Sequence, residues 1–196
     1  MTSADVSTWP DLFIVEHFLS LATCREILAA MNVARSEAAT VYGRATSGAV
    51  DSGIRQTLRL RPSDEIVELI TTRLSDQQSA LEKHFGFKVT ECEEPQFLRY
   101  GVGDFFVAHQ DGNTGLLRLD TELRRISLVI FLSRESEMPQ PDTYCGGSLL
   151  FTDFRADRKG SVAGEPGTLV AFRSETTHEV TPVTHGERYS IVSWFR

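Results

Sequence analysis

Two stretches in the first half of the chain place hydrophobic residues at helical spacing. The first follows Ser20, a residue type that commonly caps helices, and its apolar positions recur every three to four residues: Leu21, Cys24, Ile27, Leu28 and Met31. The second follows Pro62 and Ser63, has acidic residues in its first turn and ends before Gly86. Its apolar face consists of Ile66, Val67, Ile70, Leu74 and Leu81. Both stretches predict amphipathic helices that cover an apolar surface.

From Phe87 onward the pattern changes to short β-rich runs separated by Gly, Pro, Asn and Asp. The runs are FKVTECEE, QFLRY, DFFVAHQD, RRISLVIFLS, GGSLLF, GTLVAF, HEVTPV and RYSIVSWFR. Short strands broken by turn residues favour an antiparallel sandwich or barrel, and helices confined to the N-terminal half favour helical cover on one face. The pattern predicts a mainly β fold with supporting helices, a double-stranded β-helix (a cupin-like jelly roll). We expect a single domain over residues 1–196, with helical support over 1–86 and the jelly-roll core over 87–196.

The composition is that of an ordinary globular protein, with 41% hydrophobic and 24% charged residues among 196. Acidic residues outnumber basic ones by 27 to 20, and this net charge of -7 disfavours a nucleic-acid partner. Three widely spaced cysteines, Cys24, Cys92 and Cys145, fit neither a disulfide framework nor a zinc-thiolate site and favour a reducing compartment. Signal-peptide features and long apolar runs are absent, so we expect a soluble, cytoplasmic protein without a membrane partner. The pattern does not indicate an oligomeric state.

The run DFFVAHQD ends in His109 and Asp111, which are candidate metal ligands. Residues i and i+2 of a strand point to the same face, so both side chains can reach one metal ion. A neutral imidazole and a carboxylate are suitable adjacent ligands for such an ion. For this short motif alone, a surface pair at a strand end is the alternative, because H-x-D also occurs by chance.

A third candidate ligand is His178, which begins a β-rich run and can point into the mouth of a barrel. Arg188 follows ten residues later, with Ser190 on the same face of the last run, and Val192 and Trp194 continue that face. A guanidinium and a hydroxyl are groups that hold a carboxylate. Because a buried arginine without an anionic partner is costly, we expect an anion beside Arg188.

With this combination of H-x-D, a distal His, Arg ten residues on and Ser two residues later, the sequence resembles the Fe(II)- and 2-oxoglutarate-dependent oxygenases. It resembles most closely their prolyl 4-hydroxylase branch, over most of the chain. The resemblance implies that His109, Asp111 and His178 are a catalytic iron triad that leaves three coordination positions open. Two of these would take the keto-acid end of 2-oxoglutarate and one would take O2.

The resemblance also implies roles for the co-substrate site and the reaction. Arg188 and Ser190 would hold the far carboxylate of 2-oxoglutarate, and Tyr100 would add a hydrogen bond. A C-H bond would be hydroxylated with release of succinate and CO2, and relatives often benefit from ascorbate. Asp111 stands where halogenase relatives have a small residue, which favours hydroxylation.

Two features depart from the patterns of particular relatives. Phe131 stands about where relatives of the animal oxygen-sensing type have a tyrosine that binds the co-substrate, so the resemblance does not supply that contact. The positions after Arg188 are Ser190, Val192 and Trp194 rather than the R-x-N-x-T-x-R series of nucleic-acid demethylases. This difference also argues against a nucleic-acid substrate.

The segment ATVYGRATSGAVDSGIRQT between the predicted helices is rich in Gly, Ser and Thr and predicts a partly flexible loop. The resemblance implies that residues from about 42 to 55 close over a substrate, with Tyr42, Arg44 and Arg55 as contacts. A surface connection without this role is the alternative. We expect a prolyl residue in a peptide or protein as the substrate; a free amino acid or small metabolite is the alternative.

Two other classes of protein could also use parts of this pattern. A zinc hydrolase could use two His and one Asp, but it needs a general base near the metal-bound water. Glu179 follows His178 and points to the other side of its strand, which makes it a poor base. A non-catalytic jelly-roll binding module could keep a degenerate triad, but here the triad and the Arg188 and Ser190 pair are complete.

Overall fold

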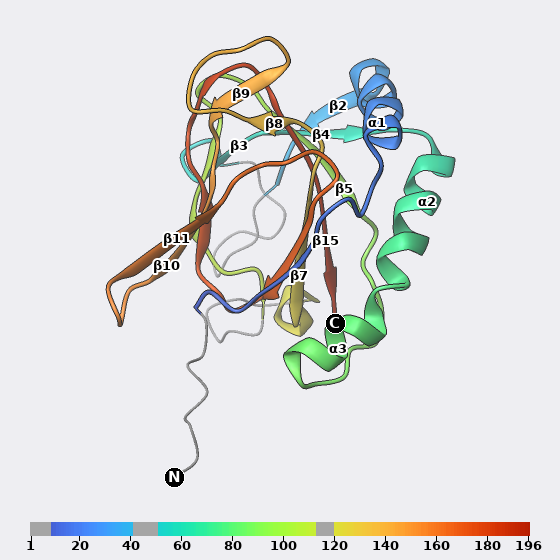
Figure 1. Ribbon diagram of the computed structural model, residues 1–196, viewed down its shortest axis with the longest axis vertical. Coiled ribbons are helices and arrows are strands. Elements are labelled where there is room, and N and C mark those ends of the chain that lie inside the picture. Colours follow the sequence, from blue (N-terminus) through green and yellow to red (C-terminus); the bar gives the residue numbers. More distant parts are fainter. Residues whose placement is uncertain (1–8, 41–50, 113–119) are drawn as a thin grey trace.

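The computed structural model describes residues 9–40, 51–112 and 120–196, in which two β-sheets face each other (Figure 1). The larger sheet has seven strands in the order β1-β12-β7-β15-β5-β4-β2. Their bounds are Leu12–Val15, Leu169–Arg173, Ile126–Phe131, Arg188–Phe195, Gln96–Tyr100, Leu58–Arg61 and Arg35–Ala38. The second sheet has five strands in the order β11-β10-β13-β6-β3, with bounds Arg158–Val162, Leu149–Asp153, His178–Val180, Phe105–His109 and Arg55–Gln56.

A three-stranded sheet in the order β14-β9-β8 closes one end, with bounds Val183–His185, Thr143–Gly146 and Arg134–Glu135. Among the described strands, only β8 and β9 pair in parallel. The mainly β, jelly-roll class predicted from the sequence is confirmed.

The first predicted helix is confirmed as α1, Leu21–Val33, and its start follows from a side-chain cap. The Ser20 hydroxyl accepts a hydrogen bond from the Thr23 backbone N–H at 3.0 Å, which satisfies one of the unpaired donors at the helix N-terminus. Cys24, Ile27 and Met31 are buried against the larger sheet. The amphipathic pattern therefore fixes which face of α1 meets the core.

The prediction of one continuous second helix was wrong, because the segment forms two helices. These are α2, Asp64–Ser75, and α3, Gln78–Phe85, which run in different directions (Figure 1). The Gln77 N–H bonds to the Leu74 carbonyl three residues back, a tighter turn that ends the α-helical ladder. The expected end before Gly86 is confirmed: Gly86 caps α3 with φ of 77°, a left-handed conformation that glycine adopts without steric cost.

The strand predictions were wrong at three places. The run FKVTECEE is extended but contains only an isolated bridge between Cys92 and Phe195. The run HEVTPV is divided into β13 and β14, because Pro182 lacks an N–H for a ladder. The first 86 residues contribute strands as well as helices, since β1, β2 and β4 extend the larger sheet.

Strand β7 shows how the layers are held together. Ile126, Leu128 and Ile130 pack in the cluster that contains the helices, whereas Val129 and Phe131 pack in a second cluster with strands of the five-stranded sheet. Successive side chains of a strand point to opposite faces, so both faces of β7 are buried. The helices thus cover the outer face of the larger sheet, and the inner face of that sheet packs toward the five-stranded sheet.

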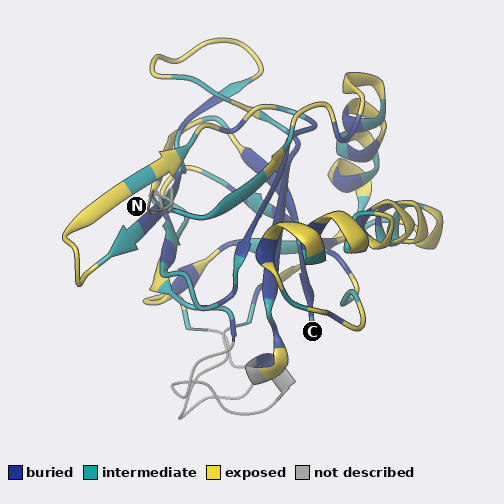
Figure 2. Ribbon diagram, turned by 60° about the horizontal axis from the view of Figure 1, so that its bottom comes forward, coloured by how far each residue is buried: buried dark blue, intermediate teal, exposed yellow. Residues whose placement is uncertain are grey.

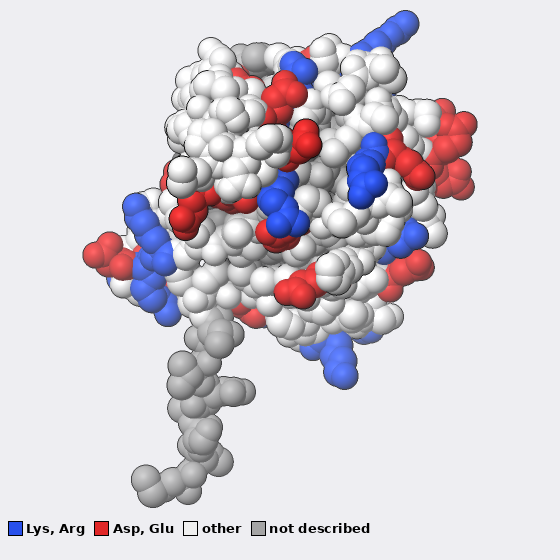
Figure 3. Space-filling model, turned by 45° about the horizontal axis from the view of Figure 1, so that its top comes forward, with Lys and Arg blue, Asp and Glu red and all other residues white. Residues whose placement is uncertain are grey.

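Charged residues of both signs lie on the face of the molecule seen in Figure 3. The helices expose one side and bury the other (Figure 2). On the face seen in Figure 3, Lys and Arg side chains alternate with Asp and Glu, without a continuous basic patch among the described residues. None of the helices in the described ranges has the length and apolar character needed to cross a membrane.

Candidate metal centre

His109 and His178 are brought together by the pairing of two strands. His109 is the last residue of β6 and His178 the first of β13, and the two are direct partners in the antiparallel register. Their ring centroids are 4.3 Å apart. Two residues that are far apart in the sequence therefore lie in one site, because β6 and β13 are neighbours in the five-stranded sheet.

Asp111 joins the two histidines, although not in the way that the strand pattern suggests. Strand β6 ends at His109, so Asp111 lies beyond it, with its backbone N–H bonded to the Ser174 carbonyl at 2.9 Å. Its carboxylate oxygens lie 3.4 Å from Nε2 of His109 and 3.4 Å from Nε2 of His178. The three ligand atoms all lie within 4.8 Å of one another, a separation that one metal ion can span.

The imidazoles are oriented by backbone carbonyls. Nδ1 of His109 lies 2.8 Å from the Val107 carbonyl, and Nδ1 of His178 lies 2.9 Å from the Thr176 carbonyl. A carbonyl only accepts, so each Nδ1 carries a proton, and Nε2 is the nitrogen through which each ring could bind a metal. Burial lowers the pKa of His178 to about 4, and His109 acts in the same direction, so the His178 ring is neutral near pH 7.

The Asp111 carboxylate is held by further polar groups that the sequence analysis missed. Ser127 donates a hydrogen bond to Asp111 Oδ2 at 2.7 Å, and the Ser174 hydroxyl lies 3.0 Å from that of Ser127. Burial by itself raises the pKa of Asp111, but His178, His109 and Arg124 outweigh it and hold the pKa well below its usual range. Ser127 could have been noticed as a polar residue within the apolar run RISLVIFLS.

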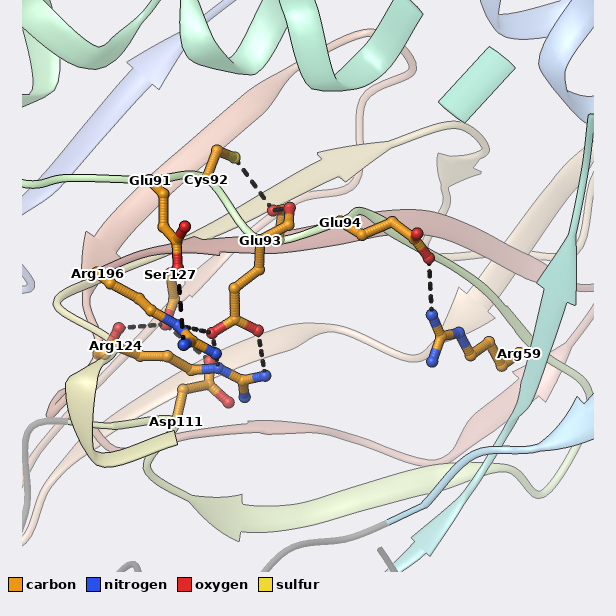
Figure 4. A network of polar contacts seen from close by, with 11 residues as sticks. Arg59, Glu91, Cys92, Glu93, Glu94, Asp111, Arg124, Ser127 and Arg196 are labelled. Atoms are coloured by element: carbon orange, nitrogen blue, oxygen red, sulfur yellow. Dashed lines mark hydrogen bonds and ion pairs between the residues drawn. The ribbon is translucent and has the colours of Figure 1, made fainter. Parts of the chain in front are cut away.

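Arg124 is itself fixed on the other side by a bidentate ion pair. Its Nε and Nη2 donate to the two oxygens of Glu93 at 2.9 and 2.7 Å (Figure 4). Arg196 adds a second contact to Glu93 at 3.0 Å, and the Arg124 guanidinium lies 3.6 Å from the Trp194 ring. Arg124 thus has a defined position near the metal ligands rather than a free range of conformations.

A cavity of about 610 Å³ lies between the two sheets and includes the three candidate ligands. Apolar side chains of both sheets form much of its wall: Leu98, Val129, Leu149, Val180 and Val192. Tyr100 and Arg188 also line it. A cavity of this size, with apolar walls and a few polar groups beside a candidate metal site, is suited to bind a small organic ligand or part of a larger one.

Arg188 is the principal charge deep in this cavity, with 2% of its surface exposed. Its Nη1 donates to Ser190 Oγ at 2.9 Å, and its guanidinium lies 5.1 Å from the Tyr100 ring and 5.4 Å from the Phe131 ring. Its Nε is buried without a hydrogen-bond partner among the described residues. The site thus presents a buried cation, a hydroxyl and a phenol, which fit an anionic ligand.

Tyr144, which the sequence analysis did not single out, supplies a hydroxyl beside Arg188. Burial raises its pKa to about 12 even though Arg188 acts to lower it. The hydroxyl has no hydrogen-bond partner among the described residues. Phe131 carries no hydroxyl, so Tyr144 on β9 offers one to this region from a different strand.

The expected substrate contacts are only partly located. Arg55 lies on β3 and lines the cavity. Tyr42 and Arg44 lie outside the described residues. Phe106, which the sequence analysis also missed, lies between Arg55 and the metal site: its ring is stacked on His109 with centroids 3.5 Å apart.

The donor set determines which cofactors the site can accept. Two neutral imidazoles and one carboxylate on one side of an ion suit non-haem Fe(II), and leave coordination positions for other ligands. The Arg188 region suits a carboxylate that reaches in from the metal. The residues present therefore fit both Fe(II) and a dicarboxylate co-substrate.

Comparison with known proteins identifies the family. Residues 95–196 match the 2OG-Fe(II) oxygenase superfamily. A PKHD-type hydroxylase of Burkholderia ambifaria is 31% identical over 182 residues, which cover 90% of this chain and 72% of that protein. A PKHD-type hydroxylase of Shewanella sp. (strain MR-7) is 32% identical over 169 residues, which cover 80% of this chain and 66% of the relative.

Solved structures share the fold. A prolyl-4-hydroxylase of Pseudomonas putida has a TM-score of 0.67 at 23% identity, covering 95% of this chain and 92% of that one. A prolyl hydroxylase of Trichoplax adhaerens, solved with a hypoxia inducible factor peptide fragment, has a TM-score of 0.68 at 16% identity, covering 95% and 84%. The chain belongs to the 2OG-Fe(II) oxygenase superfamily and is a prolyl 4-hydroxylase-like dioxygenase that depends on Fe(II), 2-oxoglutarate and O2.

Proposed function

We propose that this dioxygenase hydroxylates a C-H bond of a prolyl residue in a peptide or protein, acting as one domain. In this proposal His109, Asp111 and His178 hold Fe(II). Arg188, Ser190 and Tyr100 bind the far carboxylate of 2-oxoglutarate. The observation that carries the proposal is that three ligand atoms within 4.8 Å of one another and the buried Arg188 line the same cavity.

Bound Fe(II) supplies the oxygen chemistry, in which O2 and 2-oxoglutarate are consumed, one oxygen atom enters the product hydroxyl and the other enters succinate, with CO2 released. The protein's own residues orient the reactants. The backbone carbonyls of Val107 and Thr176 fix the two imidazoles, and Ser127 fixes the Asp111 carboxylate. Arg188 holds one end of the co-substrate, so that its keto-acid end points toward the ligands.

The preference for a prolyl substrate rests on the relatives and on the cavity wall. The PKHD-type hydroxylases are hydroxylases by name, and the neighbouring solved structures are named prolyl hydroxylases. Phe106 and Trp194 line the cavity here and offer ring faces on which a pyrrolidine ring can pack. A free amino acid or small metabolite with the same chemistry is the second candidate, because the cavity can also enclose a small molecule.

The hydrolase alternative loses support from the composition of the cavity. Among the described lining residues, Asp111 is the only carboxylate, and it is a metal ligand in the proposal. No second acid is therefore available as a general base for a metal-bound water. This observation favours oxygen chemistry over hydrolysis.

The first test measures co-substrate binding and turnover. Protein purified without oxygen should be stabilised against heat by Mn(II) and 2-oxoglutarate together more than by either alone, because both bind only the folded site. Fe(II) and O2 should then release labelled CO2 from 2-oxoglutarate, and Asp111→Ala should abolish the release. Metal binding without any decarboxylation would contradict the proposal.

The second test identifies the substrate. Proline-containing peptides and free amino acids are incubated with enzyme, Fe(II), 2-oxoglutarate and O2, and products are detected by mass spectrometry as the gain of one oxygen atom. Hydroxylated peptides with unmodified free proline would support the proposal. The reverse result would favour the metabolite alternative.

A further inference from the structure

Among the described residues, four arginines line the cavity, and they differ in whether a carboxylate already pairs with them. Arg124 is paired with Glu93 at 2.7 Å, and Arg59 is paired with Glu94 at 3.4 Å (Figure 4). Arg55 and Arg188 form no ion pair with any described residue. Two cations of the cavity are thus neutralised by the protein, and two are not.

Arg55 is buried, and its backbone and side chain are both held by neighbouring residues. Its strand β3 pairs with β6, with Arg55 opposite Phe106, and only 9% of its surface is exposed. Nη1 donates to the Thr40 carbonyl at 3.2 Å, whereas Nε is buried without a partner in the described chain. The carbonyl fixes the orientation of the guanidinium but does not neutralise it.

The position of Arg55 connects it to the metal centre. Its guanidinium carbon lies 4.7 Å from the centroid of the Phe106 ring. The same ring is stacked on His109, with centroids 3.5 Å apart and an angle of 18° between the planes. The Phe106 ring thus contacts both the Arg55 guanidinium and a proposed metal ligand.

A buried cation that lacks an anion is unfavourable unless a ligand supplies the anion. In the proposed function 2-oxoglutarate neutralises Arg188, and nothing in that function neutralises Arg55. We propose that Arg55 binds a carboxylate of the substrate itself, next to the carbon that is hydroxylated. This inference rests on the proposed function and narrows the substrate class to one that is acidic at the reaction site.

Two sources of this carboxylate have the same chemistry. One is an Asp or Glu side chain that flanks the target proline within a peptide. The other is the α-carboxylate of a terminal or free proline. A guanidinium binds a carboxylate from either source with two parallel hydrogen bonds. An amide has the same shape as the carboxylate but lacks its charge, so it cannot replace the carboxylate in this pairing.

The experiment compares matched pairs of probes that differ only in charge. One pair is a capped peptide with Glu or Gln beside proline, and the other is a peptide with a C-terminal proline as the free acid or the amide. Hydroxylation is measured by mass spectrometry. Binding is measured by fluorescence anisotropy with the inactive Mn(II) and 2-oxoglutarate complex, which gives a readout that does not need turnover.

Wild-type protein should prefer the acidic member of one pair by about tenfold or more in both readouts. Arg55→Gln should remove that preference, so that the acidic and amide members bind and react alike. Arg55→Lys, which keeps the charge, should retain part of the preference. The pair that responds identifies the source of the carboxylate.

Arg59→Gln is the matched control. Arg59 lines the same cavity, but its positive charge already has a carboxylate partner, Glu94. The substitution should leave the preference unchanged. Equal treatment of acid and amide by the wild type in both pairs, or an equal loss on both members in Arg55→Gln, would overturn the inference. Uncoupled release of CO2 from 2-oxoglutarate, measured in parallel, shows separately whether the proposed function itself holds.

Discussion

His109 and His178 are opposite each other across β6 and β13, with their ring centroids 4.3 Å apart. Backbone pairing of the two strands fixes both rings, and each Nδ1 bonds to a main-chain carbonyl. Asp111 lies beyond the end of β6, and its carboxylate accepts a hydrogen bond from a side chain, that of Ser127. The carboxylate is therefore the ligand whose surroundings are most open to change by mutation.

Asp111→Ala should lower the affinity for Mn(II) by more than about 100-fold, because losses of mere supporting contacts to metal ligands already cost about 10- to 100-fold. The measurement is metal titration by calorimetry without oxygen. His185→Ala is the control, since His185 is exposed at the end of β14. Unchanged affinity in Asp111→Ala would remove this residue from the site.

Ser127→Ala should weaken Mn(II) binding by about tenfold without unfolding the protein, because Ser127 donates to the Asp111 carboxylate at 2.7 Å. The same titration measures the effect, and circular dichroism checks the fold. Ser161→Ala, on the exposed strand β11, should have no effect. A loss of thermal stability without any change in metal affinity would indicate a purely structural role for Ser127.

If Arg188 holds the far carboxylate of 2-oxoglutarate as proposed, Arg188→Met should reduce the affinity for 2-oxoglutarate by about 100-fold, because it removes the charge that pairs with that carboxylate. Mn(II) affinity should stay within about threefold, because Arg188 is not one of the proposed metal ligands. Binding is followed by calorimetry with Mn(II) present. Arg134→Gln is a suitable control, because Arg134 is exposed and pairs with Glu165. Equal losses of metal and co-substrate binding would point instead to a collapsed cavity.

Tyr144→Phe should change stability and binding in opposite directions. The hydroxyl is buried without a partner among the described residues, so its removal should raise the free energy of unfolding of the ligand-free protein by up to about 1 kcal/mol. If the hydroxyl donates to the carboxylate that Arg188 holds, affinity for 2-oxoglutarate should fall by about tenfold. Chemical denaturation and calorimetry measure the two effects, and stabilisation without weaker binding would exclude the contact.

The sequence alone predicts those features that depend on the pattern of residues within one short segment. The cap at Ser20 predicts the start of α1, and the alternation after Arg188 places Val192 and Trp194 on the cavity wall with it. The β-rich runs predict the class of fold because turn residues separate them. These features depend on periodicity within a single segment.

The remaining features depend on contacts between distant segments. The break between α2 and α3 has no Gly or Pro to announce it, and β2 has four exposed residues without an apolar alternation. The approach of Tyr144 to Arg188 joins β9 and β15, which no local pattern connects. The ion pair of Arg124 with Glu93, which has no counterpart at Arg55 among the described residues, likewise follows from the tertiary structure alone.

If His109 and His178 hold iron as proposed, the pairing of β6 with β13 also couples the iron content of the protein to its local folding. Separating these two strands would separate the two imidazoles, so a bound ion opposes that opening by an amount that grows with its concentration. Iron limitation would then act on more than the rate of hydroxylation. Loss of iron would first destabilise the pairing of β6 with β13 in the five-stranded sheet. The fraction of molecules with these strands separated would then rise as the iron concentration falls.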